Sequence, residues 1–381
     1  MTGHSADDDT RTVFVTSTRR NAVPISRTDW VHHLVVQQGN EPGRRIEVGA
    51  SPVRMGRRPN CEIVIHDDEV SGLHCQVHCE AGSEDLTVTD LHSTNGTFVD
   101  GHRVSGSVRL ASLGVLQLGR QVLRHEFRAR REAEIAAELD RDLDKASAYL
   151  RSLLPQPIRQ GPVRAEWILL PSARLGGDAL GYFQIDEERF ASYLIDVSGH
   201  GISAAVHAVS VLNVLRQRAL PGIDLADPVQ VLTRLNEMFP MEDHGGLFFT
   251  MWYGVYGLRT RRLQFASAGH HPAYLVAADR QAVQPLQTRN PMIGALPGHV
   301  YTGGSIAVPT GSCLHVFSDG IFEIETIEGQ SWRLADFVPL LSEPAQPGIT
   351  EPERLLAAVR QRARPAPPDD DISVFTVTFL T

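Results

Sequence analysis

A single segment limits the folds open to this chain. From Glu126 to Leu154 there is no glycine or proline, and charges of both signs are frequent. Apolar residues recur there at steps of three and four, at Ile135, Leu139, Leu143, Ala146, Leu150 and Leu153. This spacing predicts a long helix with a narrow apolar seam, ended by Pro155 and Pro157. The parts on either side are then expected to fold separately, and 381 residues are enough for two domains.

The part ahead of the helix has the pattern of an all-β domain. Residues 31–127 contain short alternating runs, such as Glu62–Ile65, His74–His78 and Leu86–Thr89, with glycine- and asparagine-containing turns between them. Short strands, frequent turns and no helical periodicity predict a β-sandwich. Residues 1–30 are polar and mixed in charge, and we expect them to form a flexible tail.

Strands and helices mix in the part after the helix. Apolar runs predict buried strands, and one longer run predicts a helix ended by Pro221. The strand runs are 192–197, 248–258, 263–267, 313–317 and 372–380, and the helical run is 203–220. This mixture predicts an α+β domain with substantial antiparallel sheet. The predicted organisation is a first domain at 31–127, a helical linker at 128–156 and a second domain at 157–381.

Composition argues against several classes of protein. The formal net charge is -9, with 45 acidic and 36 basic residues, which disfavours a nucleic-acid binder. The four cysteines form no CxxC pair and lack zinc-site spacing, so we expect them to be reduced. The N-terminus has no apolar core of a signal peptide, and no apolar run reaches the roughly 18 residues of a membrane helix. We therefore expect a cytoplasmic protein with no membrane partner.

Aspartates beside glycine mark the strand ends of the second domain. Asp178 follows two glycines, Asp196 and Asp319 end apolar runs, and Asp370 precedes the last run. A lone Asp-Gly pair is usually only a turn. Four aspartates at strand ends suit a hard-cation site, because magnesium and manganese prefer oxygen ligands. Two such ions can clamp a phosphate and activate a water for in-line attack.

The motifs around these aspartates follow one another in a specific order. They are Gly176-Gly177-Asp178, Asp196-Val197-Ser198-Gly199-His200-Gly201, Ala268-Gly269-His270-His271-Pro272, Ser318-Asp319-Gly320 and Asp370-Asp371-Ile372-Ser373. In this order they closely resemble the PPM-type protein phosphatases, in the bacterial SpoIIE-like branch, over about residues 150–381. The resemblance implies a central antiparallel β-sandwich flanked by helices, with two Mn²⁺ or Mg²⁺ ions at one end.

The resemblance also implies a role for each residue. Asp196, Asp319 and Asp370 would be catalytic, and Asp196 would bridge both ions. Asp178 and the Val197 carbonyl would complete the metal ligands. The implied reaction is hydrolysis of phosphoserine or phosphothreonine in a protein by metal-activated water. In this branch the substrates are often phosphorylated anti-sigma-factor antagonists. The histidines at 200 and 270 are expected to be structural and to pack beside the turns.

Loop residues of the first domain suggest a phosphate-binding pocket. Arginine gives bidentate contacts to phosphate, and hydroxyls fill the remaining oxygens. The pattern Gly56-Arg57, Ser71-x-x-His74 and Ser93-Thr94-Asn95-Gly96-Thr97 resembles a forkhead-associated (FHA) domain. That resemblance implies binding of a phosphothreonine-containing protein. Arg57, Ser71 and Thr94 would contact the phosphate, Asn95 would hold the peptide backbone, and the glycine at 56 and the histidine at 74 would be structural.

Two glycines depart from these family patterns. Gly181 stands where the phosphatase branch often has a second acid, and it favours an alternative function: a phosphopeptide-dependent scaffold with a weak or inactive phosphatase-like domain. Gly72 stands where FHA domains often have arginine or lysine, which predicts weak or selective binding. The helix leaves two arrangements open, packing on its own phosphatase domain or pairing with a second copy as a homodimer. It can also couple FHA occupancy to phosphatase activity.

Overall fold

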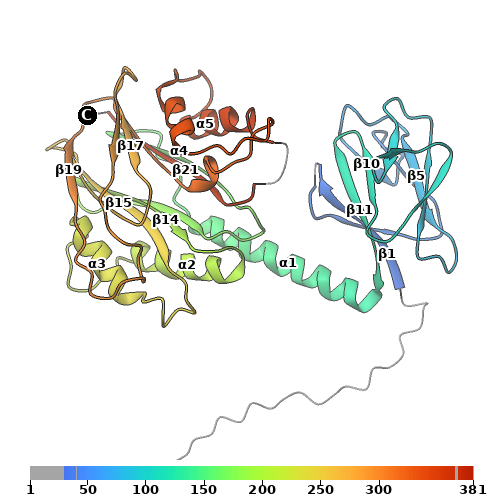
Figure 1. The fold of residues 1–381 in the computed structure, drawn as a ribbon, viewed down its shortest axis with the longest axis horizontal. Helices are drawn as coiled ribbons and strands as arrows, with labels where there is room; N and C mark the ends of the chain where they lie inside the picture. The colour runs from blue at the N-terminus through green and yellow to red at the C-terminus, as the bar shows by residue number, and fades with distance from the viewer. Residues whose placement is uncertain (1–29, 40, 365–367, 381) are drawn as a thin grey trace, which may run out of the picture. The chain divides into compact units, whose positions relative to one another are not determined.

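The computed structural model describes residues 30–39, 41–364 and 368–380. The chain splits into two compact units, residues 1–140 and 141–381, and each contains its own pair of β-sheets (Figure 1). The predicted flexible tail, apart from Trp30, lies outside the described residues.

The first unit is a β-sandwich. One sheet has the strand order β2-β1-β11-β10-β7-β8 and the other has the order β4-β3-β5-β6-β9. The strands are β1 (Trp30–Gln38), β2 (Arg45–Val48), β3 (Val53–Gly56), β4 (Ile63–Val64), β5 (Cys75–Cys79), β6 (Leu86–Asp90), β7 (Thr97–Val99), β8 (His102–Arg103), β9 (Ser107–Leu110), β10 (Val115–Leu118) and β11 (Gln121–Ala129). Alternate residues such as Leu34, Val77 and Leu116 form its buried core. The all-β prediction for this part is confirmed.

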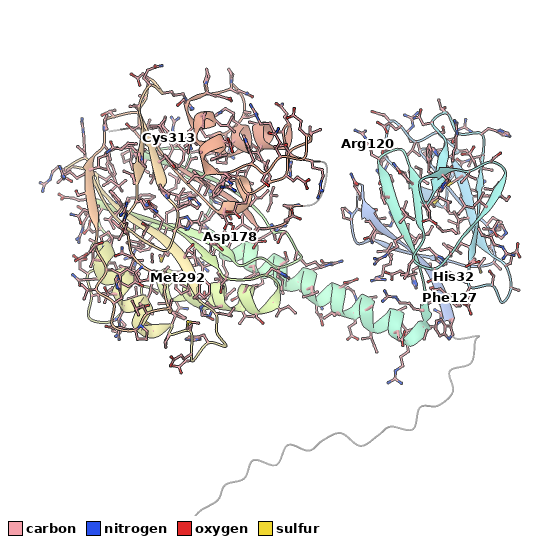
Figure 2. The ribbon with its side chains drawn as sticks, in the orientation of Figure 1. His32, Arg120, Phe127, Asp178, Met292 and Cys313 are labelled. Atoms are coloured by element: carbon pink, nitrogen blue, oxygen red, sulfur yellow. The ribbon has the colours of Figure 1, made fainter. Side chains whose placement is uncertain are left out.

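The predicted helix is present as α1 (Arg130–Leu153). It begins later than the sequence pattern suggests, because residues up to Ala129 continue β11 and pair with β1. On the same β1–β11 pair the rings of His32 and Phe127 pack with centroids 4.5 Å apart (Figure 2). The buried Glu126 carboxylate accepts a 2.6 Å hydrogen bond from Arg45, which also contacts Asp140 in α1.

The second unit contains two five-stranded sheets. Their strand orders are β12-β21-β20-β17-β18 and β13-β14-β15-β16-β19. The strands are β12 (Val163–Leu170), β13 (Asp178–Gln184), β14 (Arg189–Val197), β15 (Phe249–Gly257), β16 (Arg262–Ala268), β17 (Ala273–Val276), β18 (Val283–Leu286), β19 (Gly304–Ala307), β20 (Cys313–Phe317) and β21 (Ile372–Phe379). The helices are α2 (Ile202–Arg216), α3 (Pro228–Met238), α4 (Leu334–Phe337), α5 (Glu351–Arg360) and the short 3₁₀ helices η2 (Asp319–Ile321) and η3 (Val338–Ser342). The strands and helix predicted from apolar runs correspond to β14, β15, β16, β20, β21 and α2, although α2 ends at Arg216, before the predicted end at residue 220.

The second unit has four layers, with a helix layer outside each sheet (Figure 1). The alternation of side chains along the strands produces this arrangement. On β14, Leu194 faces the other sheet, whereas Tyr193 and Ile195 face α2 and α3. The outer face of β21 packs in the same way against α5, through Val374 and Leu355. The predicted α+β domain, with a β-sandwich between helices, is confirmed.

In the described part of the chain, no helix combines the length and the apolarity that crossing a bilayer requires.

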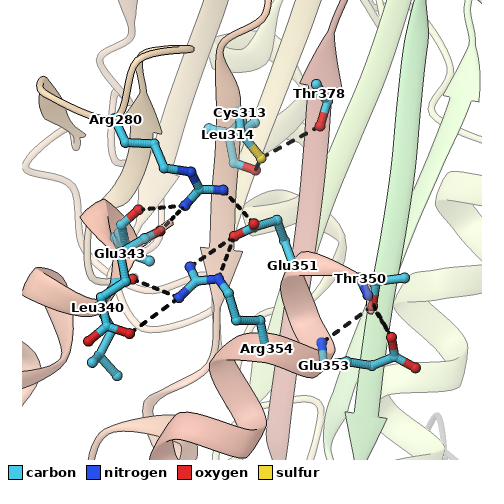
Figure 3. A network of polar contacts seen from close by, with 11 residues as sticks. Arg280, Cys313, Leu314, Leu340, Glu343, Thr350, Glu351, Glu353, Arg354 and Thr378 are labelled. Atoms are coloured by element: carbon cyan, nitrogen blue, oxygen red, sulfur yellow. Dashed lines mark hydrogen bonds and ion pairs between the residues drawn. The ribbon is translucent and has the colours of Figure 1, made fainter. Parts of the chain in front are cut away.

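A polar network holds α5 in place (Figure 3). The Arg354 side chain is 1% exposed and contacts Glu351 at 2.9 Å, Glu343 at 3.6 Å and the Leu340 carbonyl at 3.1 Å. Arg280 reaches the other oxygen of Glu351 and donates to the Glu343 carbonyl at 2.7 Å. A buried charge needs such partners, because its desolvation is costly.

Replacing Arg354 with leucine should therefore destabilise the second unit. We expect a loss of roughly 3 kcal/mol in the free energy of unfolding, at the low end for a broken buried pair because Arg280 still neutralises Glu351. The matched control is Arg234→Leu on α3, whose exposed ion pair with Glu237 also spans three residues. It should cost less than about 1 kcal/mol. Chemical denaturation of both variants measures the difference, and equal losses would contradict the prediction.

Candidate functional site

Asp178 and Asp196 are brought together by strand pairing. Asp178 begins β13, Asp196 lies one residue from the end of β14, and the two are direct partners in the antiparallel register. Direct partners project their side chains from the same face of a sheet. This face is the interior of the sandwich, because Leu180 and Leu194 on the same strands face the opposite sheet. The two carboxylates therefore lie at the end of the sandwich where β13 begins and β14 ends.

Asp319 and Asp370 come to this end of the sandwich from the opposite sheet. Asp319 follows β20, Asp370 precedes β21, and these two strands are paired. Asp319 and Asp370 both act on the carboxyl of Asp196 electrostatically, and Asp370 acts on that of Asp319. The structure thus brings together all four aspartates that were predicted from the motifs. Asp178 is buried, Asp196 and Asp319 are half-buried, and Asp370 is exposed.

Burial and repulsion from neighbouring carboxylates make the carboxyls of Asp178, Asp196 and Asp319 difficult to ionise. Burial, followed by repulsion from Asp319 and Asp370, raises the pKa of Asp196 to about 7. Burial and Asp370 raise the pKa of Asp319 to about 6. The pKa of Asp178 is raised well above its usual value by burial and then by Asp196. Such clusters of raised carboxyl pKa values are typical of sites that use a bound cation or a proton.

The residues present fit a divalent cation. The Oδ2 atom of Asp178 is buried without a hydrogen-bond partner among the described residues. The nearby hydroxyls of Ser318 and Ser373 offset only part of the rise in its pKa. Within the described ranges, no three Asp, Glu, His or Cys side chains converge closely enough to hold a metal by themselves. Magnesium tolerates this, because it binds through one or two carboxylates and keeps several waters.

Asp371 is a structural carboxylate that the sequence reasoning did not single out. It is 4% exposed and accepts hydrogen bonds from the Gly177 amide at 2.6 Å and from the Ser172 amide at 2.7 Å. A Cβ at Gly176 would lie 2.3 Å from its carboxylate, and a Cβ at Gly320 would lie 2.3 Å from its carbonyl oxygen. These glycines are therefore required by close approach to Asp371, whereas the sequence pattern suggested only tight turns.

Gly181 lies on the other face of β13 from Asp178. The register of β13 is unbroken, so residues three apart point to opposite faces. A Cβ at position 181 would lie 2.3 Å from the hydroxyl of Tyr193, which fills this space. An acid at 181 in this strand would point away from the Asp178 carboxylate. The glycine therefore gives no geometric support to the interpretation of a weakened metal site.

The remaining predicted residues of this site differ in their surroundings. The Val197 carbonyl lies against Gly177, where an added Cβ would be 2.9 Å from it. His270 is buried beside the turn after β16, as expected of a structural histidine. His200 is exposed, so the prediction that it packs beside its turn is wrong. His200 stands between Gly199 and Gly201, both of which have a φ of 83°.

In the first unit, the predicted phosphate-binding residues lie in neighbouring loops. The Thr94 amide donates to the Ser71 hydroxyl at 2.9 Å, and the Arg57 amide donates to the Ser71 carbonyl at 3.0 Å. The Arg57 side chain is half exposed and lies 3.6 Å from Asp68. The Asn95 side-chain amide donates to the Glu69 carbonyl at 2.8 Å. Arg57, Ser71, Thr94 and Asn95 are thus placed together, although Asn95 already has a partner in its own chain.

His74 and Gly56 make contacts that hold these loops together. His74 is fully buried, accepts from the Ser71 amide at 3.0 Å and lies 3.1 Å from the Gly96 carbonyl, so it joins the two loops. A Cβ at Gly56 would lie 2.5 Å from the Gly72 carbonyl. Both contacts are structural.

Arg58 lies where a side chain at position 72 would be. The Nε atom of Arg58 is 2.9 Å from the position of an added Cβ at Gly72. Its exposed guanidinium makes no hydrogen bond or ion pair with the part of the chain that the structure describes. The sequence reasoning missed this residue, and its signal was the second arginine of Arg57-Arg58 beside a glycine at 72. Similarly, the signal for Asp371 was the continuous Asp369-Asp370-Asp371 run.

Comparison with known families agrees with this geometry. Residues 186–380 match the family described as Stage II sporulation protein E (SpoIIE), and residues 53–119 match the FHA domain. The first match covers β14 to β21 of the second unit, with Asp196, Asp319 and Asp370. The second contains the loops with Arg57, Ser71, Thr94 and Asn95.

Individual relatives match one unit each. The phosphoserine phosphatase RsbP of Bacillus subtilis is 27% identical over 184 residues, which are 48% of this chain and 45% of RsbP. RsbU of the same organism, also named a phosphoserine phosphatase, is 25% identical over 52% of this chain and 57% of its own length. The chain therefore matches about half of the length of these relatives. FhaB of Mycolicibacterium smegmatis is 37% identical over 90 residues, 24% of this chain and 57% of FhaB.

Two solved structures share the fold of the phosphatase-like unit. The SiaA-PP2C domain of Pseudomonas aeruginosa has a TM-score of 0.56 at 19% identity, over 65% of this chain and 99% of that domain. The PP2C phosphatase domain of SpoIIE from Bacillus subtilis, with a fragment of its regulatory domain, has a TM-score of 0.50 at 15% identity, over 79% and 80%. At these identities the likeness concerns the fold.

Proposed function

Since the chain belongs to the SpoIIE family and carries an FHA domain, we propose that it is a metal-dependent serine/threonine protein phosphatase that binds phosphothreonine partners. The observation that carries this proposal is the meeting of four aspartates at one end of the sandwich. Asp178 has a buried oxygen there that no described residue hydrogen-bonds, and the pKa values of Asp196 and Asp319 are raised. A pair of divalent cations, Mn²⁺ or Mg²⁺, is the ligand that such a group of carboxylates suits.

Each residue has a distinct part in the proposed mechanism. When bound, the cations supply the Lewis acidity that makes water nucleophilic near neutral pH. Asp196, central among the carboxylates, would hold both ions, with the Val197 carbonyl beside it. Asp319 and the exposed Asp370 would complete one position, and Asp178 would support the other. Because Asp178 is buried, its side of the site is kept away from bulk water, and the electrostatic interactions there are stronger.

The proposed substrate class is a phosphoserine or phosphothreonine side chain of a protein. The support is the printed name of RsbP and RsbU, phosphoserine phosphatase, and by analogy an anti-sigma-factor antagonist is a candidate substrate. Phosphate release from peptides carrying phosphoserine, phosphothreonine or phosphotyrosine tests this. We expect the first two to be hydrolysed in the presence of Mn²⁺. Equal or faster hydrolysis of phosphotyrosine would contradict the assignment.

Metal binding should stabilise the fold in a pH-dependent way. Folding raises the pKa of Asp196 to about 7 from an unfolded value of about 3.9, so the metal-free fold loses stability as the pH rises between these values. Cations relieve this repulsion. We therefore expect Mn²⁺ to raise the melting temperature strongly at pH 8 and little at pH 5, and chelation to reverse the effect. A stabilisation that is equal at both pH values would contradict the prediction.

For the FHA unit we propose that two arginines meet the phosphate. A phosphothreonine carries nearly two negative charges at neutral pH, and Arg57 is already partly neutralised by Asp68. Arg58 places a guanidinium over Gly72 that no described residue pairs with, and it can supply the second charge. The hydroxyls of Ser71 and Thr94, which are hydrogen-bonded to each other, would bind the remaining phosphate oxygens. This arrangement offers an alternative to the weak binding expected from Gly72.

Binding of a phosphothreonine peptide library to the full chain tests this pocket. We expect Arg57→Ala and Arg58→Ala each to weaken binding about tenfold or more, the loss of one charge-assisted contact. Gly72→Arg in the Arg58→Ala background should restore most of it, because the new side chain enters the space that Arg58 leaves.

The control for this experiment is Arg109→Ala, which removes an exposed arginine on β9. It should bind as wild type does. If wild type does not prefer phosphorylated over unphosphorylated peptides, the FHA assignment is wrong. If only Arg57→Ala matters, the role given to Arg58 is wrong and the pocket stands.

The second candidate function is a phosphopeptide-dependent scaffold with an inactive phosphatase-like unit. Gly181 was the feature in its favour, and its position on the far face of β13 weakens that argument. Pairing of α1 with a second copy remains a proposal for either function. Its support is the exposure of Ile135 and Leu139, which are 58% and 55% exposed on the predicted apolar seam.

A further inference from the structure

His270 is a buried histidine with a partner at each ring nitrogen. The side chain is 3% exposed and follows Gly269, whose φ of 64° turns the chain after β16. Its Nε2 lies 3.1 Å from the Phe317 carbonyl oxygen, and its Nδ1 lies 2.8 Å from the Thr250 hydroxyl. His270 therefore connects β15 with β20, and the proposed chemistry does not use this histidine.

The two partners determine which nitrogen carries the proton. A carbonyl oxygen can only accept, so Nε2 of His270 must donate to Phe317. Burial, and then the neighbouring His271, hold the pKa of His270 well below its usual value, so the ring is neutral. In a neutral imidazole the other nitrogen accepts, and the Thr250 hydroxyl therefore donates to Nδ1. This fixes the orientation of the Thr250 side chain.

The two partners also belong to the two sheets that carry the aspartates. Thr250 on β15 is the register partner of Asp196 on β14. Phe317 is the last residue of β20, and Asp319 begins η2 directly after the intervening serine. His270 thus links the neighbour of Asp196 to the strand that carries Asp319, across this end of the sandwich.

Hydrogen bonds on the other side of the site complete a ring of contacts. The Ser318 hydroxyl donates to the Asp371 carbonyl at 3.0 Å, and the Asp371 carboxylate accepts from the Gly177 amide at 2.6 Å. Gly177 leads into Asp178, which pairs with Asp196. Hydrogen bonds and strand pairing therefore connect both sheets on two sides of the carboxylates, and His270 provides the connection on one of these sides.

We propose that His270, acting through Thr250, is a positioning residue that sets the separation between Asp196 and Asp319 and thereby the affinity of the site for divalent metal. The inference rests on the proposed function. His270 does not itself contact substrate or metal. The physical reason for its effect is that residues behind the metal ligands fix the orientation of those ligands, and their loss typically costs about 10–100-fold in metal affinity or activity.

The test uses the full chain and Mn²⁺, with binding measured by calorimetry and turnover measured with p-nitrophenyl phosphate. We expect His270→Leu and Thr250→Val each to raise the dissociation constant for Mn²⁺ about tenfold. Combining them should add less than about threefold, because the two residues act through one contact. Thr250→Ser keeps the hydroxyl and should bind Mn²⁺ as wild type does. Thr250→Val is nearly isosteric and keeps the test decisive if His270→Leu does not fold.

His315→Leu is the matched control for removing a buried histidine. His315 is fully buried on β20, and neither of its ring nitrogens has a hydrogen-bond partner within the described ranges. It should lower stability without changing Mn²⁺ affinity. The inference is overturned if His270→Leu, like His315→Leu, has the same Mn²⁺ affinity as wild type. It is also overturned if the effects of His270→Leu and Thr250→Val add in full.

The same experiment separates the inference from the proposed function. Wild type that neither binds Mn²⁺ nor releases phosphate overturns the proposed function and the inference together. Wild type that does both, with His270→Leu unchanged, overturns the inference alone. A nitrogen-15 spectrum of the metal-free protein adds a readout that is independent of activity: it should show His270 as the neutral tautomer with its proton on Nε2.

Discussion

Replacing Asp196 with asparagine should abolish metal-dependent phosphate release and, at the same time, make the metal-free protein more stable at neutral pH. Activity falls because the central carboxylate of the site loses its charge, and losing one such electrostatic group typically costs on the order of 10²–10³ in turnover. Stability rises because asparagine resembles the protonated carboxyl, which the fold prefers. The measurements are phosphate release and thermal melting in the presence of a chelator.

The direction of the stability change follows from the pKa of Asp196. Burial and neighbouring carboxylates raise it to about 7, above an unfolded value of about 3.9. The ionised form is therefore penalised in the folded state at pH 8, and we expect a gain of roughly 1–3 kcal/mol there. The gain should shrink as the pH falls toward 5, where the carboxyl is already protonated in the fold.

Asp279→Asn is the control for this substitution. Asp279 is exposed in the loop between β17 and β18, and among the interactions that the structure describes its carboxylate accepts a hydrogen bond only from the Gln281 backbone amide. It should leave both activity and stability near wild type. An Asp196→Asn protein that keeps its activity, or that is less stable than wild type at pH 8 without metal, would contradict the account of this site.

Replacing Asp371 with alanine should have the second largest effect, on stability and activity together. Its carboxylate accepts from the Gly177 amide and from the amide and hydroxyl of Ser172. Removing it leaves the buried Gly177 amide and the part-buried Ser172 donors without this acceptor, and each unsatisfied buried group costs about 1–3 kcal/mol. We expect a loss of about 3 kcal/mol or more in the free energy of unfolding, from the two amides with the smaller hydroxyl term. Turnover should fall as well, because Asp178 follows the loop that Asp371 holds.

The neighbouring Asp369 provides the control, because it belongs to the same acidic run. It is exposed and makes no hydrogen bond or ion pair with the residues that the structure describes. Asp369→Ala should leave stability and turnover unchanged. Denaturation and phosphate release measure both variants, and equal behaviour of Asp369→Ala and Asp371→Ala would show that the run acts only through its total charge.

Much of the fold was predictable because its strands are bounded by local signals. The run 313–317 is apolar except for His315 and is buried throughout, since it lies in a sheet covered on both faces, and it corresponds to β20. The linker helix was predictable from its periodicity, but its first residue was not. The residues from Glu126 to Ala129 have a helix-compatible composition and are nevertheless held in β11 by pairing with β1, a tertiary contact that local sequence does not encode.

The candidate site was predictable only as a set of residue types. Motif order identified Asp178, Asp196, Asp319 and Asp370, but their meeting depends on the pairing of β13 with β14 and of β20 with β21. The roles of supporting residues could not be read from the sequence. Asp371 differs from its neighbours in being buried against Gly177, and Arg58 is distinguished by lying over Gly72. Both depend on contacts between segments that are distant in sequence.

The measurement that tests the central claim most directly is hydrolysis of p-nitrophenyl phosphate by the folded, full-length wild type as Mn²⁺ is added. The site described here predicts no turnover in the presence of a chelator and a rate that rises and saturates with millimolar Mn²⁺. It also predicts that Asp319→Asn abolishes that rate. This substitution removes the charge of a carboxylate that raises the pKa of Asp196 and whose own pKa is raised by Asp370. A folded wild type that hydrolyses nothing at saturating Mn²⁺, or an equal rate in the chelator, would contradict the claim and favour a phosphopeptide-binding scaffold.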